Sequence, residues 1–320
     1  MKAAVLRELG KPPRCEDFDD PAAGDEEVIL QVRAASLKAV DKQLAAGSHF
    51  ASPRELPVIC GTDGIGDLPD GTRVFFGGPR RPYGAMAQRT VARTAFCFPV
   101  PDALDDATAA ALPNPGVSAV LSLSQRAKVA KGEKVLILGA TGVTGKLAVQ
   151  IAKQLGAGRV IASGRNPQVL QKLRELGADA TIPLNQPDDD LRKAFQQEAG
   201  KSGFNVIIDY VWGHPIEVLL SAITRPEFAA INSETRLVQV GESAGSTIAL
   251  PAAVLRSTAL TILGTAGIPS REVLAAAMQQ VLDWAANGAL QIEIETVPLA
   301  GIEIAWQRPE SAGRRLVVIP

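Results

Sequence analysis

A glycine-rich turn at residues 139–145 is the strongest chemical signal in the sequence. It reads Gly-Ala-Thr-Gly-Val-Thr-Gly, and its last six residues match GxGxxG with alanine in the first glycine position. The apolar run KVLIL precedes the turn, and the helical pattern GKLAVQIAKQLGA follows it. A strand, a tight turn and a helix in this order direct backbone N–H groups and the positive end of the helix at a pyrophosphate. We therefore expect a dinucleotide to bind at Ala140, Thr141, Gly142, Val143, Thr144 and Gly145, the alternative being a plain tight connection between strand and helix.

The end of the next predicted strand bears on which nicotinamide cofactor is bound. The strand ends in Ser163, Gly164, Arg165 and Asn166, where an NAD-selective protein usually has an Asp or Glu for the ribose 2′-hydroxyl. A guanidinium and a hydroxyl suit a 2′-phosphate, whose charge a carboxylate would repel. We expect these four residues to bind NADPH. The alternative is that Arg165 is a solvated loop residue before a helix that begins at Pro167.

Two kinds of segment pattern divide the chain. Residues 1 to about 115 contain short apolar runs separated by Gly and Pro pairs, which predicts antiparallel strands joined by turns. From Ala127 onward, short apolar strands alternate with helical segments, which predicts βαβ units and a doubly wound parallel sheet. After Gly267 a helix and further strand patterns follow, and they most economically rejoin the first domain. The fold class expected is α/β.

Composition excludes several classes of function. The 320 residues are 46% hydrophobic and 21% charged, which is ordinary for a globular protein of two domains. The 33 Lys and Arg residues nearly cancel the 34 Asp and Glu residues, so no global field would attract nucleic acid or an anionic membrane. Three scattered cysteines without CxxC spacing argue against a disulfide framework: Cys15, Cys60 and Cys97. With no signal-peptide pattern and no apolar run of membrane-spanning length, we expect a cytoplasmic protein that recognises a small molecule.

Nine segments extend in order along nearly the whole chain: MKAAVLRELG, AASLKAVDKQLAAG, PVICGTDGIG, PYGAMAQRTVA, ALPNPGVSAV, ILGATGVTGKLAVQIAKQLGA, VIIDYVWG, RLVQVG and VPLAGIEIAWQRPESAGRRLVVIP. Their order and spacing resemble the medium-chain dehydrogenase/reductases, and within them the quinone oxidoreductase-like branch. The resemblance implies a GroES-like β domain built from residues 1–117 and 267–320, and an NADP-binding Rossmann domain at residues 118–266. It also implies a homodimer that pairs edge strands of the nucleotide domains, with ALTILG as the candidate edge.

The resemblance also bears on zinc. Zinc alcohol dehydrogenases of this superfamily have a Cys where this chain has Lys38, a His-Glu pair where it has Thr62-Asp63, and a structural lobe of four Cys, whereas this chain has three cysteines in all. The two histidines, His49 and His214, and the dispersed cysteines do not provide a close set of zinc ligands. We therefore expect no metal, and reduction of a quinone or an α,β-unsaturated carbonyl compound by NADPH. The alternatives are an NADPH-binding sensor or structural protein with little turnover, and an atypical zinc-type alcohol dehydrogenase.

Candidate catalytic residues follow from the same resemblance. Lys38 stands where the branch often has Asn near the nicotinamide ribose, so it could orient the ribose or stabilise enolate charge, or else be a solvated loop lysine. Phe50 falls near an aromatic position over the substrate cleft of relatives, and His49 beside it could donate a proton or be incidental. Tyr83 could donate to a substrate carbonyl or simply pack against the cleft floor.

The remaining candidates concern the cofactor. Ser118 stands where relatives have a Thr at the start of a helix beside the nicotinamide end, although an ordinary helix hydroxyl fits equally. Val240 and Gly241 end a strand that should pass close to the nicotinamide. Arg314 resembles the first of a basic pair from which one arginine reaches cofactor phosphate. Asp209 ends a strand at the carboxyl edge of the sheet, and we interpret it as a turn-former rather than an acid catalyst.

Overall fold

The computed structural model describes residues 1–224, 234–265, 269–309 and 313–320. The chain divides into two compact units, one formed by Met1–Asn114 together with Met278–Pro320 and the other by Pro115–Ala277. The chain returns to the first unit within helix α9 (Arg271–Ala286), later than the position after residue 266 that the sequence suggests.

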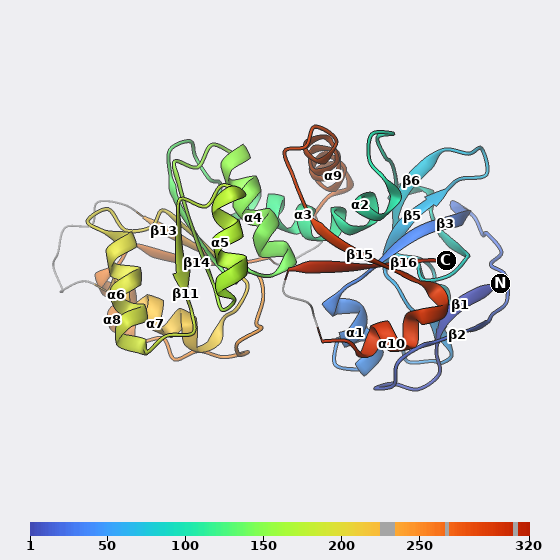
Figure 1. Ribbon diagram of the computed structural model, residues 1–320, viewed down its shortest axis with the longest axis horizontal. Helices are drawn as coiled ribbons and strands as arrows, with labels where there is room; N and C mark the ends of the chain where they lie inside the picture. The colour runs from blue at the N-terminus through green and yellow to red at the C-terminus, as the bar shows by residue number, and fades with distance from the viewer. Residues whose placement is uncertain (225–233, 266–268, 310–312) are drawn as a thin grey trace. The chain divides into compact units, whose positions relative to one another are not determined.

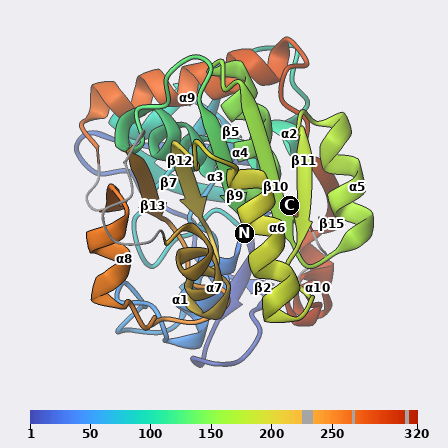
Figure 2. The same cartoon turned by 90° about the vertical axis from the view of Figure 1, so that its left-hand side faces the viewer.

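A parallel sheet forms the centre of the second unit. Its strands lie in the order β11-β10-β9-β12-β13-β14, and every neighbouring pair is parallel. Figure 2 shows β13, β12, β9, β10 and β11 following one another across this sheet. The strands span Lys134–Leu138 (β9), Arg159–Gly164 (β10), Ala180–Pro183 (β11), Val206–Asp209 (β12), Thr235–Gln239 (β13) and Leu260–Gly264 (β14). This arrangement confirms the predicted doubly wound parallel sheet.

Helices cover both faces of this sheet. They are α3 (Pro113–Val120), α4 (Val143–Gln154), α5 (Pro167–Glu175), α6 (Asp188–Ala199), α7 (Gly213–Ile223) and α8 (Ala252–Ser257), with a π-helical turn at Leu121–Arg126. Alternate strand residues such as Leu136 and Ile207 pack with Phe195 of α6 and Leu219 of α7, while α4 and α5 lie on the opposite face (Figure 1). The order reverses at β9, whose neighbours are β10 and β12, so the carboxyl ends of these strands form the crevice where open α/β sheets bind ligands.

The first unit is built on two sheets whose strand pairs are antiparallel except for the parallel pair β15 and β16. A small sheet has the order β2-β1-β4, and a larger one has the order β15-β16-β3-β5-β6-β8, with β7 also paired to β3. The strands are β1 (Lys2–Leu6), β2 (Arg14–Asp17), β3 (Glu27–Leu37), β4 (Val58–Ile59), β5 (Asp63–Asp67), β6 (Arg73–Gly77), β7 (Arg89–Arg93), β8 (Cys97–Pro99), β15 (Glu293–Pro298) and β16 (Arg314–Ile319). The C-terminal strand β16 pairs with β3 from the first part of the chain, so both chain ends build this unit.

Short helices complete the first unit. Besides the C-terminal part of α9, they are α1 (Ala39–Ala46), α2 (Asp106–Ala111) and α10 (Ile302–Gln307), with 3-10 turns at Thr94–Phe96 and Leu299–Gly301. Apolar side chains of α1 and α10 share one core with the strands, in which Phe76 and Ile302 are fully buried. In the described part of the chain, no helix is both long enough and apolar enough to cross a bilayer.

Candidate cofactor and substrate sites

The glycine-rich turn joins β9 to α4 by backbone contacts that only glycine permits. Gly139 has a φ of +82°, in the left-handed region, so it supplies the tight turn that the pattern assigns to its first glycine. Ala140 is fully buried, and its N–H donates to the Ser163 carbonyl at 2.7 Å. A Cβ on Gly145 would lie 2.4 Å from the Gly139 carbonyl oxygen and 2.6 Å from the Ala140 Cα. The start of α4 therefore packs directly on β9, with its free N–H groups at the carboxyl edge of the sheet.

The end of β10 packs against the same turn. A Cβ on Gly164 would lie 2.4 Å from Thr141 Cγ2, so glycine is needed where the two segments meet. Arg165 follows as an exposed residue beside an open hollow that it lines with Asn166, Pro167 and Gln168. The Asn166 side chain caps α5 by accepting from the Gln168 and Val169 N–H groups at 3.0 and 3.1 Å. The predicted helix start at Pro167 is confirmed.

Ser163 requires a correction. We expected its hydroxyl to suit a 2′-phosphate, but the side chain is fully buried and the hydroxyl donates to the Ile137 carbonyl of the adjacent strand at 3.4 Å. The residue lies within β10, where it faces the interior of the unit. Arg165 is therefore the charged group at this strand end that remains accessible to a phosphate.

Asp209 organises the adjacent strand end. Its Oδ1 accepts from the Val211 and Trp212 N–H groups at 2.8 and 3.0 Å, which confirms the prediction of a turn-former. Its backbone carbonyl accepts from the N–H groups of Val240 and Gly241 at 2.8 and 3.1 Å, so these two residues lie beside β12 at the carboxyl edge of the sheet. Oδ2 is buried and has no hydrogen-bond partner among the described residues. Burial raises the pKa of Asp209 to about 6.

The raised pKa predicts a pH-dependent effect of Asp209→Asn. The folded-state pKa of about 6 exceeds the unfolded value near 3.8, so the stability that the protonated carboxyl contributes is complete below pH 4 and is lost as the pH rises through 6. Asparagine keeps an Oδ1 acceptor for both N–H groups and carries no charge. We expect the variant to be more stable than the native protein at pH 7.5, by at most roughly 3 kcal/mol, and similar to it at pH 4. Urea denaturation at both pH values measures this, and a difference that does not change with pH would contradict it.

In the first unit, Lys38 forms the centre of a buried ionic cluster. It is 3% exposed and precedes helix α1 as its N-cap. Its Nζ lies 2.9 Å from Asp63 Oδ1 and 3.1 Å from Asp41 Oδ2, and donates to the Ser36 carbonyl at 3.0 Å. Burial acts to lower the pKa of Lys38, but the carboxylates of Asp41 and Asp63 outweigh it and raise that pKa above its ordinary value. The interpretation of Lys38 as a solvated lysine is wrong, and its three ammonium donors already have acceptors, so none is left for a ribose or an enolate.

This cluster does not fit a zinc site. Lys38 and Asp63 stand where zinc-dependent relatives have a Cys and the Glu of a His-Glu pair, and here the two form an ion pair with each other. An ammonium repels Zn²⁺ unless it loses its proton, and its acidic neighbours favour the charged form. Within residues 1–224, 234–265, 269–309 and 313–320, no group of three or more His, Cys, Asp and Glu side chains is arranged to hold a metal ion.

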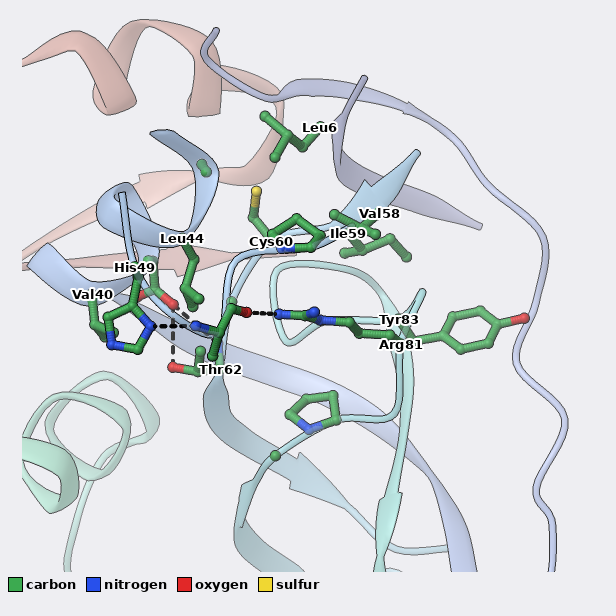
Figure 3. A pocket seen from close by; sticks show the side chains of 17 residues that line it. Leu6, Val40, Leu44, His49, Val58, Ile59, Cys60, Thr62, Arg81 and Tyr83 are labelled. Atoms are coloured by element: carbon green, nitrogen blue, oxygen red, sulfur yellow. Dashed lines mark hydrogen bonds between the residues drawn. The ribbon is translucent and has the colours of Figure 1, made fainter. Parts of the chain in front are cut away.

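A cavity of about 330 Å³ lies in the first unit, beside the cluster (Figure 3). Much of its lining is apolar and comes from β1, α1 and β4: Leu6, Val40, Leu44, Ala45, Val58 and Ile59. Its polar lining residues are Asp41, His49, Thr62, Arg81 and Tyr83. Asp41 Oδ1 accepts from the Thr62 N–H at 3.1 Å and from the Thr62 hydroxyl at 3.2 Å. The volume is at the lower end of the range for sites that bind small organic molecules.

The structure brings His49 and Tyr83 to this cavity but limits what they can donate. His49 Nδ1 accepts from the Ala51 N–H at 3.1 Å, so only Nε2 remains as a donor while this bond persists. The exposed ring of Phe50 lies against that of His49, with 4.3 Å between the centroids. The Tyr83 hydroxyl donates to the Asp20 carbonyl at 3.1 Å, and its ring extends away from Thr62 (Figure 3). Tyr83 therefore packs at the cavity wall, as the alternative interpretation held, and its one hydroxyl proton is already donated.

Two further candidates lie elsewhere. Ser118 is half-buried in α3 of the second unit, one turn after the helix begins at Pro113 rather than at its start. Arg314 begins β16 in the first unit, and its Nη1 lies 3.6 Å from Glu295 Oε2 of β15. Arg314 thus has an acidic partner within its own sheet, which sets it apart from the exposed Arg165.

Sequence reasoning missed two residues of the cavity, Asp41 and Arg81. Asp41 accepts from the backbone N–H of Lys38 at 2.9 Å in a capping-box arrangement, and the three-residue spacing is the signal that could have found it. Arg81 has no such signal, because it follows another arginine in a proline-rich turn and nothing in the sequence separates the two.

Comparison with known proteins agrees with this geometry. Residues 143–287 match the family model described as zinc-binding dehydrogenase. The chain is 26% identical to quinone oxidoreductase-like protein 2 of Bos taurus over 274 residues, 82% of this chain and 74% of that protein. It is 28% identical over 179 residues to the chloroplastic NADPH-dependent alkenal/one oxidoreductase of Arabidopsis thaliana, covering 51% of this chain and 46% of that protein. The solved quinone oxidoreductase of Thermus thermophilus, whose structures include a complex with NADPH, is 26% identical with a TM-score of 0.81 and both chains fully covered. Together these similarities support an oxidoreductase of the medium-chain dehydrogenase/reductase superfamily, in its quinone oxidoreductase-like branch.

Proposed function

We propose that this protein is an NADPH-dependent reductase that transfers a hydride to a quinone or to an α,β-unsaturated carbonyl compound without zinc. The observation that carries the proposal is the pairing of the glycine-rich turn with Arg165 at the next strand end. The turn offers backbone N–H groups to a pyrophosphate, and the exposed guanidinium suits a 2′-phosphate. The names of the relatives, which include quinone and alkenal/one oxidoreductases, agree with this choice of acceptor.

The roles of the residues follow from their positions. Residues 140–145 would hold the pyrophosphate, Arg165 the 2′-phosphate, and Val240 with Gly241 would border the nicotinamide side of the same crevice. When bound, NADPH would supply a hydride for the β-carbon of an enone, and water would supply the proton for the α-carbon. The chain's contribution would be chiefly orientation of the two reactants and exclusion of water around them.

We propose a reaction without zinc because of the side chains that stand at the positions of the zinc ligands. The Lys38 ammonium replaces one ligand, and Asp63 is committed to it, so the site offers no Lewis acid to stabilise the alkoxide of an alcohol substrate. Quinone or enone reduction does not require that stabilisation.

The decisive experiment measures NADPH oxidation by the purified protein with a panel of quinones and enones, before and after exhaustive EDTA treatment. We expect turnover with several acceptors, a rate that EDTA leaves unchanged, and well under one zinc per chain. Tight NADPH binding without oxidation by any acceptor would instead favour a sensor. Activity that EDTA abolishes and added zinc restores would overturn the proposal in favour of a zinc-type dehydrogenase.

We also propose a homodimer that forms through β14. This strand ends the described sheet of the second unit, and its apolar Ile262 is 37% exposed. Light scattering that returned the 33.6 kDa mass of one chain at micromolar concentration would refute the dimer.

A further inference from the structure

Arg81 is an exposed residue that lines the cavity of the first unit. Figure 3 shows its side chain extending across the cavity toward Thr62, with a hydrogen bond from Nη2 to the Ala51 carbonyl. The Ala51 N–H, in turn, donates to His49 Nδ1. The backbone of Ala51 thus holds both basic side chains, and the guanidinium keeps further N–H donors beyond the one it gives to Ala51.

Arg81 differs from its neighbour in having no carboxylate partner among the residues that the structure describes. Arg80 pairs with Glu27 at 2.9 Å and donates to the Ala22 carbonyl at 2.8 Å. No ion pair to Arg81 is formed by any residue that the structure describes. An arginine at the wall of a cavity, held by one carbonyl and not neutralised by a described residue, is arranged to receive an anion.

The cavity itself does not supply that anion. Asp41 is the one carboxylate among its lining residues, and both of its oxygens are occupied. Oδ1 accepts twice from Thr62, and Oδ2 accepts from the Lys38 N–H and lies 3.1 Å from Lys38 Nζ. Asp41 therefore has no oxygen left for the guanidinium of Arg81, which remains available to a ligand.

The other lining residues of the cavity indicate the chemistry of the part of the ligand that does not contact Arg81. Apolar side chains from three elements surround the space near the guanidinium, which favours a compact apolar body with a single anionic group. One guanidinium matches one carboxylate in a two-pronged hydrogen bond, whereas the second charge of a phosphate dianion would find no further Lys or Arg among the lining residues. We propose that Arg81 is a specificity-determining residue that binds a carboxylate on the hydride acceptor. The acceptor would be an α,β-unsaturated ketone that also carries a small apolar group. This inference rests on the proposed reductase function.

A matched pair of acceptors tests this role: trans-3-benzoylacrylate, which carries a carboxylate, and its neutral methyl ester. We expect Arg81→Leu to raise KM for the acid by about 10- to 100-fold, the loss of a hydrogen-bonded charge pair, with kcat and the kinetics of the ester little changed. Arg81→Lys should restore part of the affinity because it keeps the charge but not the planar pair of donors. Arg80→Leu is the control, since Arg80 lies outside the cavity lining, and it should leave the ratio of acid to ester unchanged.

Binding without turnover separates this inference from the proposed function. Calorimetry with the saturated acid 3-benzoylpropionate should give a Kd about 10- to 100-fold weaker in Arg81→Leu than in the native protein. If this difference appears while no acceptor oxidises NADPH, the carboxylate site stands and the reductase proposal fails. Equal affinity of the native protein and Arg81→Leu for the acid would overturn the inference. An equal fall of kcat in Arg81→Leu with the acid and with the ester would also overturn it, because that result would assign the guanidinium to the reacting carbonyl.

Discussion

Lys38→Met should lower the free energy of unfolding by about 3–5 kcal/mol, because it removes the cation that contacts two buried carboxylates. The side chains of Asp41 and Asp63 are 0% and 7% exposed, so water cannot replace the ammonium. Methionine has nearly the length of lysine, so little of the loss comes from an empty space. Urea denaturation of the native protein and the variant at pH 7 measures the difference.

Two variants control this measurement. Lys42→Met lies on the same helix, where Nζ donates to the Arg308 carbonyl at an exposed position, and should cost under about 1 kcal/mol. Lys38→Met combined with Asp63→Asn removes one charge of each sign from the cluster and should regain at least half of the loss. A loss in Lys38→Met no greater than in Lys42→Met would mean that the ionic cluster does not stabilise the first unit.

The second unit could be predicted well because its signals are local. The strand KVLIL, the turn and the helix follow one another without a break, and close contacts between their backbones account for the glycines. The structural role of the first glycine in the pattern is filled one residue earlier than the match suggests, because Gly139 has the positive φ and Ala140 does not. The prediction survived this shift because the order of strand, turn and helix is what directs the N–H groups.

The contacts of the first unit were harder to predict from the sequence because they join residues that are distant along the chain. Lys38 follows the end of β3 and Asp63 begins β5, and the antiparallel pairing of these strands brings them together. Neither the 25-residue separation nor the residue types reveal that pairing in a single sequence. Arg80 and Arg81 are adjacent and identical, so only the conformation of their loop sends one to Glu27 and the other to the wall of the cavity. The prediction for the Ser163 hydroxyl was wrong for a simpler reason. A strand residue can point to either face of the sheet, and the sequence did not show to which face Ser163 points.

Arg165→Glu should weaken NADPH binding by about 100-fold and change NADH binding by less than about threefold. The native guanidinium is exposed at the end of β10, beside the turn that would hold the pyrophosphate, and forms no ion pair with any described residue. The substituted carboxylate would replace attraction to the 2′-phosphate with repulsion. It could also accept from the 2′-hydroxyl of NADH, as the acidic residue does in NAD-selective proteins, so NADH affinity should hold or rise slightly.

Fluorescence titration of each cofactor into the native protein and the variant measures both affinities. Arg174→Glu makes the same change of charge near the C-terminal end of α5, at an exposed position away from the glycine-rich turn, and should change the ratio of NADPH to NADH affinity by less than about twofold. A preference that reverses in Arg165→Glu and persists in Arg174→Glu would assign cofactor choice to the end of β10. Equal losses for both cofactors, or a native protein that prefers NADH, would show that Arg165 does not select the 2′-phosphate.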